Sequence, residues 1–158
     1  MLLDNSGKAH IALDSFNVAV CKPGPFLGGT ANERGNNGGT KDPLTIFTVT
    51  GDVLLKIFGV CTTLLGGATA TVEVGLTGNT AGLIAQTVAT DIDASEIWND
   101  TTPGVGTDTY ANVTGPHIVV NGSDILETIG TTDITSGDMY YVCLWRPLSV
   151  DGNVVSAI

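Results

Sequence analysis

The stretch LTIFTVTGDVLLKIFGVC, residues 44–61, decides the fold class. Two runs rich in Val, Ile, Leu, Phe and Thr flank Gly51 and Asp52, and these residue types favour a pleated, half-buried surface. A Gly-Asp pair between two such runs predicts a hairpin, because Gly readily adopts the positive φ of a tight turn. The second run is apolar on both faces. We therefore expect the hairpin to lie centrally, with both of its faces covered.

Short alternating runs separated by turn residues continue from this stretch to the C-terminus. The pair Asn121-Gly122 is a second strong hairpin signal. The segment DIDASEIWND, residues 91–100, has a rough helical spacing and predicts one helical turn. The remaining runs that predict strands are residues 69–77, 83–88, 116–120, 124–129 and 138–145.

About eight short strands with Gly-centred turns predict an all-β protein, an antiparallel two-sheet sandwich. The strand number and length favour a jelly roll. The alternative is an immunoglobulin-like sandwich, whose Cys-Trp-Cys pattern is missing here. We expect Leu55, Val74 and Trp145 to belong to the core.

Residues 1–43 differ from the rest, and we predict an extended N-terminal arm that precedes a sandwich domain over residues 44–158. A short alternating run at residues 11–20 is followed by Pro23 and Pro25, and then by a Gly-rich polar segment over residues 27–42. Its composition is that of a flexible linker. The arm would dock on a neighbouring subunit by strand addition, so that deleting residues 1–40 would leave a folded body. The candidate contact residues of this arm are Ile11, Leu13, Phe16, Val18, Val20 and Phe26.

Charge and length limit the function classes. The chain has 158 residues, which suits one domain, and only 14% of them are charged. Its net charge is −10, and its six basic residues are scattered along the sequence. Nucleic acid is therefore not an expected partner, because phosphate binding needs clustered Lys and Arg.

Cysteine spacing and the N-terminus indicate the compartment. Cys21, Cys61 and Cys143 have no metal-ligand or redox spacing, and we expect Cys61 and Cys143 to be small buried residues. Asp4 follows Met1-Leu2-Leu3 at once, which predicts no signal peptide, and no apolar run is long enough to span a membrane. These features predict no membrane partner and assembly in a reducing cytosol.

No pattern of catalytic, cofactor-binding or metal-binding residues stands out. Asp91-x-Asp93-x-x-Glu96 resembles part of a calcium loop but has Glu96 where that loop needs Gly, so we interpret it as a solvated acidic turn. His117 follows a Pro at a strand start and is expected to be a strand-end residue. Trp98 and Trp145 could form a sugar-stacking platform, but core or interface positions are the expectation. We therefore predict a protein that is not an enzyme and has no cofactor.

The run from residue 44 to the C-terminus resembles small virion proteins of tailed bacteriophages. The resemblance is carried by TIFTVTGDVLLKIFGVC (45–61), TATVEVGLTGNTAGLIAQT (69–87), DIDASEIWND (91–100) and DMYYVCLWRPLSVDG (138–152). Within this class it is similar to capsid decoration (cement) proteins, which are often jelly-roll or similar β-folds, trimeric, with arms that reach across neighbouring capsomers.

The resemblance implies a non-enzymatic protein that binds the outside of an icosahedral head and stabilises it by bridging capsomers. Its partners would be the major capsid protein and its own copies in a homotrimer, after assembly in the host cytoplasm. The alternative is a fibre or tail-tip module that binds host glycans, which would need an exposed aromatic cleft and few copies per virion. A major capsid protein is a third option, but 158 residues are few for that role and no helix is apparent.

Overall fold

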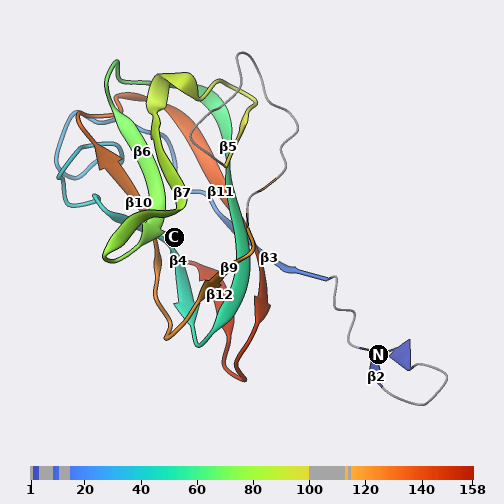
Figure 1. Ribbon diagram of the computed structural model, residues 1–158. Helices are drawn as coiled ribbons and strands as arrows, with labels where there is room; N and C mark the ends of the chain where they lie inside the picture. The colour runs from blue at the N-terminus through green and yellow to red at the C-terminus, as the bar shows by residue number, and fades with distance from the viewer. Residues whose placement is uncertain (1, 4–8, 11–14, 100–112, 114) are drawn as a thin grey trace.

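The computed structural model describes residues 2–3, 9–10, 15–99, 113 and 115–158. Two antiparallel sheets pack face to face in a sandwich, as Figure 1 shows. This architecture confirms the predicted all-β, two-sheet fold, while its assignment to the jelly roll in particular stays a prediction. Strands β1 (Leu2–Leu3) and β2 (Ala9–His10) pair only with each other, in a separate two-stranded sheet.

Each layer of the sandwich combines strands that are distant in sequence. In spatial order, the first sheet contains β12 (Asn153–Ser156), β4 (Leu44–Thr50), β10 (Ile125–Gly130), β6 (Thr71–Leu76) and β7 (Asn79–Val88). The second sheet contains β3 (Asn17–Cys21), β11 (Ser136–Pro147), β5 (Val53–Gly66) and β8 (Ile97–Trp98), with β9 (His117–Val119) also paired to β5. The alternating apolar runs therefore become strands where they were predicted.

The predicted hairpin of residues 44–61 is wrong in its pairing. A turn does form, with Gly51 at φ +60°, but β4 lies in the first sheet and β5 in the second. The turn at Asn121 and Gly122, whose φ angles are 59° and 65°, likewise links β9 of the second sheet to β10 of the first. A turn signal fixes a reversal of the chain, whereas the ladder partner is chosen by distant strands. Here the long ladder between β5 and β11 takes the place of a local hairpin.

These turns meet at one end of the sandwich, where a third crossing, from β11 to β12, joins them. Asp52 connects all three: its carboxylate accepts the Asn121 N–H at 3.0 Å, and its carbonyl accepts the Leu148 N–H at 2.8 Å. Its own N–H donates to the Ser149 hydroxyl at 2.8 Å. Hydrogen bonds among these three connections therefore stabilise this end of the sandwich, in place of the ladder bonds of a hairpin.

The core lies between the two sheets and follows strand alternation. On β5, alternate side chains such as Leu55 and Ile57 are buried, and Val74 of β6 meets them from the first sheet. Leu55 and Val74 are thus core residues, as predicted, whereas Trp145 is only partly buried against the core. The helical turn expected at residues 91–100 is wrong: the 3₁₀ turn η1 (Ala89–Asp91) shares only Asp91 with this segment, and Ile97–Trp98 form β8.

Residues 15–43 belong to the sandwich, so the prediction of a separate arm does not hold for them. Strand β3 pairs with β11 from Cys21↔Tyr141 to Asn17↔Trp145. Phe26 is fully buried, and its N–H donates to the carbonyl of Gly137 at 2.9 Å. Of the predicted arm, only residues 1, 4–8 and 11–14 lie outside the described residues.

Glycines in the expected linker serve close packing rather than flexibility. Gly28 and Gly35 have φ angles of +52° and +98°, and a Cβ on either would lie within 2.4 Å of the Ile134 carbonyl oxygen. The Ile134 N–H also donates to the Gly35 carbonyl at 2.8 Å. The Gly-rich segment is therefore a fitted loop that connects β3 to β4.

This packing predicts the result of truncation. Deleting residues 1–40 removes β3, Phe26 and Arg34, and should leave a chain that does not fold cooperatively, because the β11 edge and a buried carboxylate lose their partners. Deleting residues 1–14 keeps β3 and should retain the cooperative transition. Denaturant unfolding followed by tryptophan fluorescence compares the two variants. A cooperative transition in the longer deletion would show that the sandwich does not need this segment.

Candidate functional site

The most polar part of the interior is a buried network of Arg34, Glu127 and Tyr141. The Arg34 guanidinium binds both carboxylate oxygens of Glu127, with Nε at 3.0 Å and Nη2 at 2.5 Å. The Tyr141 hydroxyl donates to the same carboxylate at 2.5 Å. The guanidinium also donates to the carbonyls of Gly24 and Met139. The network joins the 22–43 loop, β10 of the first sheet and β11 of the second.

Aromatic rings and burial complete its environment. The Arg34 Cζ lies 3.7 Å from the centre of the Phe26 ring, and the Arg34 and Glu127 side chains are 3% and 1% exposed. Burial by itself would lower the pKa of Arg34, but the charge of Glu127 and its hydrogen bonds raise that pKa above its ordinary value. Burial, and then the charge of Glu127, raise the pKa of Tyr141 well above its ordinary value. Neutral Tyr141 is therefore a fixed hydrogen-bond donor. Because the three side chains bind one another and backbone carbonyls in the interior, we interpret the network as structural.

The network predicts strong energetic coupling. Arg34→Met or Glu127→Met alone should each lower the free energy of unfolding by about 3–5 kcal/mol, because each leaves a buried charge without its partner. The double variant should lose clearly less than the sum of the two, since it buries no lone charge. A double-mutant cycle by denaturant unfolding measures this, with Lys41→Met, exposed on the same loop, as the control. Additive losses would contradict the coupling.

The three cysteines are free thiols, and all are buried. This confirms the expectation for Cys61 and Cys143. Burial raises the pKa of the Cys61 thiol to about 11 and that of Cys143 to about 12. Burial also raises the pKa of Cys21.

Two consequences follow for the thiols. A thiol reagent at pH 8 should leave all three unmodified in the folded chain and modify all three in denaturant.

The second consequence concerns folding stability. Because folding raises the pKa values of Cys61 and Cys143 above the ordinary 9.0, the contribution of these neutral thiols to folding stability is complete below pH 9 and is lost as the pH rises toward 11 and 12. Unfolding midpoints measured from pH 7 to 11 test this trend. For the first consequence, rapid labelling of the thiols in the folded chain would contradict their burial.

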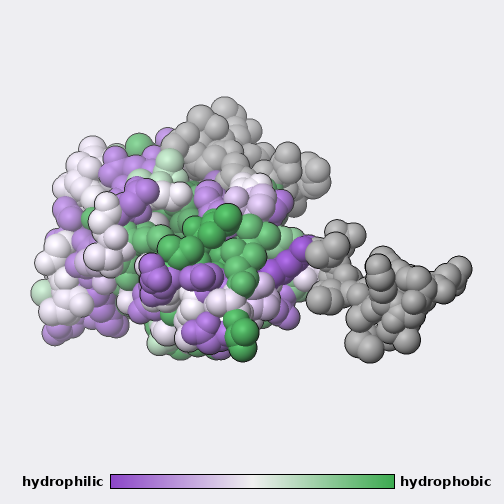
Figure 2. All heavy atoms as spheres, turned by 60° about the horizontal axis from the view of Figure 1, so that its bottom comes forward, coloured by the Kyte–Doolittle hydropathy of each residue, from purple (hydrophilic) through white to green (hydrophobic). Residues whose placement is uncertain are grey.

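The second sheet presents an apolar outer face, which we define by Val18, Val20, Phe58, Ile118, Val142 and Leu144. The strand registers bring these side chains into rows: Val142 pairs with both Val20 and Phe58, and Leu144 pairs with Val18. Val18 and Ile118 are 63% and 65% exposed. Figure 2 shows apolar side chains gathered in a continuous area of the surface with hydrophilic residues around it.

This outer face corrects one expectation about the central strand. Strand β5 is central in its sheet and its inner face is buried, but Leu54, Phe58 and Val60 on the opposite face are only partly buried. Apart from the separate β1–β2 pair, the described strands form the two layers of the sandwich and add no third sheet over this face. The first sheet differs, because Thr48, Thr50 and Glu73 point outward from it. The sandwich therefore has one polar and one apolar side.

Basic side chains lie on and beside the outer face. Lys56 lies on β5 opposite Leu144, and Arg146 lies on β11 opposite Leu54. The Lys22 Nζ lies 5.5 Å from the centre of the Tyr140 ring, and the Arg146 Cζ lies 4.4 Å from that of Phe16. Aromatic rings thus hold two of the three cations at the surface of the sheet.

The predicted contact residues separate into three groups. Phe16, Val18 and Val20 lie together on the outer face, the latter two exposed. Phe26 is fully buried under Arg34 in its own chain, so its prediction as an intersubunit contact is wrong. Ile11 and Leu13 lie outside the described residues. The partners of β3 on the outer face, Val142 and Leu144, lie in the run 138–145, for which the sequence predicts a strand and no contact.

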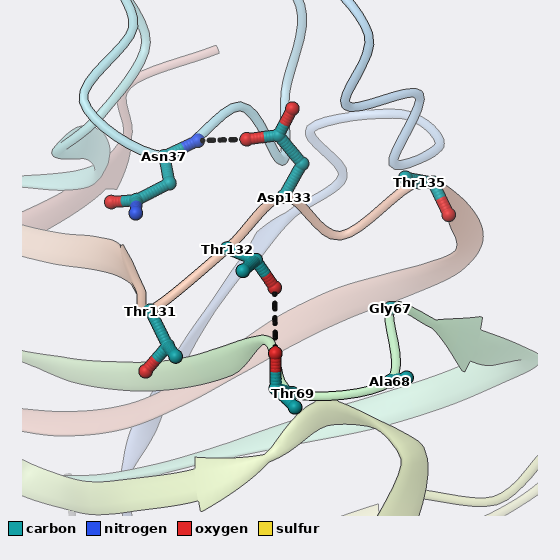
Figure 3. A pocket seen from close by; sticks show the side chains of 8 residues that line it. All are labelled: Asn37, Gly67, Ala68, Thr69, Thr131, Thr132, Asp133 and Thr135. Atoms are coloured by element: carbon teal, nitrogen blue, oxygen red, sulfur yellow. Dashed lines mark hydrogen bonds between the residues drawn. The ribbon is translucent and has the colours of Figure 1, made fainter.

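A polar pocket of about 710 Å³ lies at the end of the sandwich opposite Asp52. Figure 3 shows threonines from the loops at 67–69 and 131–135 around it, with the Asn37 N–H donating to the Asp133 carboxylate at 2.9 Å. The Thr69 and Thr132 hydroxyls are 3.3 Å apart. None of the described residues that line the pocket is aromatic. Trp98, considered for sugar stacking, is buried in the core and donates to the Thr87 hydroxyl at 3.0 Å.

The acidic segment after β7 is only partly the solvated turn that its sequence predicted, since Asp91 is exposed. Glu96 is fully buried, and its carboxylate accepts the Asp93 N–H at 2.6 Å. Among the residues that the structure describes, no group of three or more His, Cys, Asp or Glu is arranged to hold a metal ion. The described residues also contain no helix long and apolar enough to cross a membrane.

Comparison with known proteins adds no relative: no protein-family model, no curated protein and no solved structure matches the chain.

Proposed function

We propose that the chain is a capsid decoration (cement) protein of a tailed bacteriophage, which binds the outside of the icosahedral head and has no enzymatic activity. The observation that carries this proposal is the apolar outer face of the second sheet. A stable monomer rarely exposes large contiguous apolar patches, and such a patch marks an interaction site. Residues 45–61 and 138–152, which resemble small phage virion proteins, include much of that face. The resemblance therefore indicates the phage capsid as the partner of this face.

The division of the sandwich into a polar and an apolar side suits a protein that covers a shell. The apolar side would lie on the capsid, and the threonine-bearing side of the first sheet would face water. Binding only to the assembled shell stabilises it by mass action, about 2.7 kcal/mol per site when the free protein is at 100 times its Kd. Homotrimers at three-fold positions would bridge neighbouring capsomers.

The glycan-binding alternative lacks a supporting observation. It needs exposed rings that stack on sugars, whereas Trp98 is buried and none of the described residues around the polar pocket of Figure 3 is aromatic. The cement proposal is therefore the one that we carry forward.

The experiment has two parts. Quantitative mass spectrometry of purified virions should give a copy number comparable with that of the major capsid protein. The full chain, added to heads that lack it, should bind to saturation and raise the temperature at which the heads release DNA. A copy number of a few per virion, or heads with unchanged heat resistance after saturation, would overturn the proposal.

A further inference from the structure

We infer that the outer face of the second sheet binds a protein surface in which carboxylates lie among apolar side chains. This inference rests on the proposed function for the location of that surface, on the outside of the capsid shell. It goes beyond the proposal by naming the attachment face and the chemistry that the partner must present.

The distribution of charge is the first argument. The chain has a net charge of −10 and only six basic residues, yet Lys22, Lys56 and Arg146 all lie on or beside this one face. Of the other three, Arg34 is buried, Lys41 lies on the 22–43 loop, and Lys8 lies outside the described residues. Half of the positive charge of an acidic protein is thus collected around its apolar side.

The three cations are also available to a partner. No salt bridge among the described residues engages Lys22, Lys56 or Arg146. The Tyr140 and Phe16 rings hold Lys22 and Arg146 against the sheet, so less side-chain freedom is lost when a carboxylate binds them. Apolar rows supply contact area, and the cations among and beside them select an acidic partner and set its orientation.

Other occupants fit less well. A two-fold dimer through this face would gather the cations of both copies in one interface, because such an interface uses the same patch twice. A nucleic acid would place its charged phosphates against the apolar rows, and the net charge of −10 of the chain would repel it. A protein surface with carboxylates and apolar side chains satisfies both parts of the face.

The test uses the full chain and undecorated heads, with two matched pairs of variants. Ile118→Asp changes the outer face, and Val155→Asp places the same charge on an exposed position of β12 in the first sheet. Lys56→Glu changes the outer face, and Lys41→Glu makes the same reversal on the 22–43 loop. Thermal unfolding first establishes that all four fold as the parent chain does.

We expect Ile118→Asp and Lys56→Glu to weaken head binding by about tenfold or more, as is typical of disrupted interface positions. The two control variants should bind within about twofold of the parent chain, because surface changes away from the contact have small effects. Parent binding should weaken as salt rises from about 50 to 500 mM, whereas that of Lys56→Glu should depend less on salt.

Each other outcome overturns a different statement. If the parent chain binds heads and the outer-face variants bind equally well, this face is not the attachment surface, although the proposed function stands. If the parent chain does not bind heads, the proposed function fails and the partner assignment fails with it. If sedimentation shows oligomers of the free chain that Ile118→Asp dissociates, the occupant is a second copy. If anionic vesicles bind the parent chain and not Lys56→Glu, the occupant is a membrane.

Discussion

The buried pair of Arg34 and Glu127 is the interaction on which the arrangement of the sandwich depends. Glu127 brings a carboxylate into the core from the first sheet, and that charge is tolerable only with full hydrogen bonding. Arg34 and Tyr141 supply it from the 22–43 loop and from the second sheet. Since the loop also has to continue from β3 into β4, the position of Arg34 constrains where both strands enter their sheets. One ion pair thereby ties three segments that are far apart in sequence.

A second constraint arises from the two faces of the second sheet. Its inner residues fill the core, and its outer residues are apolar as well, so the sheet as a whole resembles one that is covered on both sides. In the sandwich only one cover is present among the described residues. The proposed attachment to a capsid supplies the other cover. The same reasoning explains why the first sheet, which alternates apolar and polar residues, needs none.

Much of the fold could be predicted from alternation alone, and the failures share one cause. The strands at residues 44–50, 71–76 and 136–147 match apolar runs in the sequence, because period-two alternation reflects burial of one strand face. Pairing was mispredicted at Gly51 and Asn121, since a tight turn is compatible with a hairpin and with a crossing between sheets. The Gly-rich segment was misread because composition does not distinguish a glycine needed for flexibility from one needed for close approach, as at Gly28 and Gly35.

The candidate site, too, was predictable from the sequence in part, and in part only from the tertiary structure. The apolar character of Val18, Val20 and Val142 could be seen in the sequence, but their assembly into rows is set by the register of β3 and β5 on β11. Lys22, Lys56 and Arg146 look scattered along the chain, and only the sheet brings them to one face. The sequence by itself determined the strand content, the alternation and the acidic balance, which are local or additive properties. Tertiary structure decided the strand partners, the buried ion pair and the outer face, because each depends on contacts between residues that are distant in the chain.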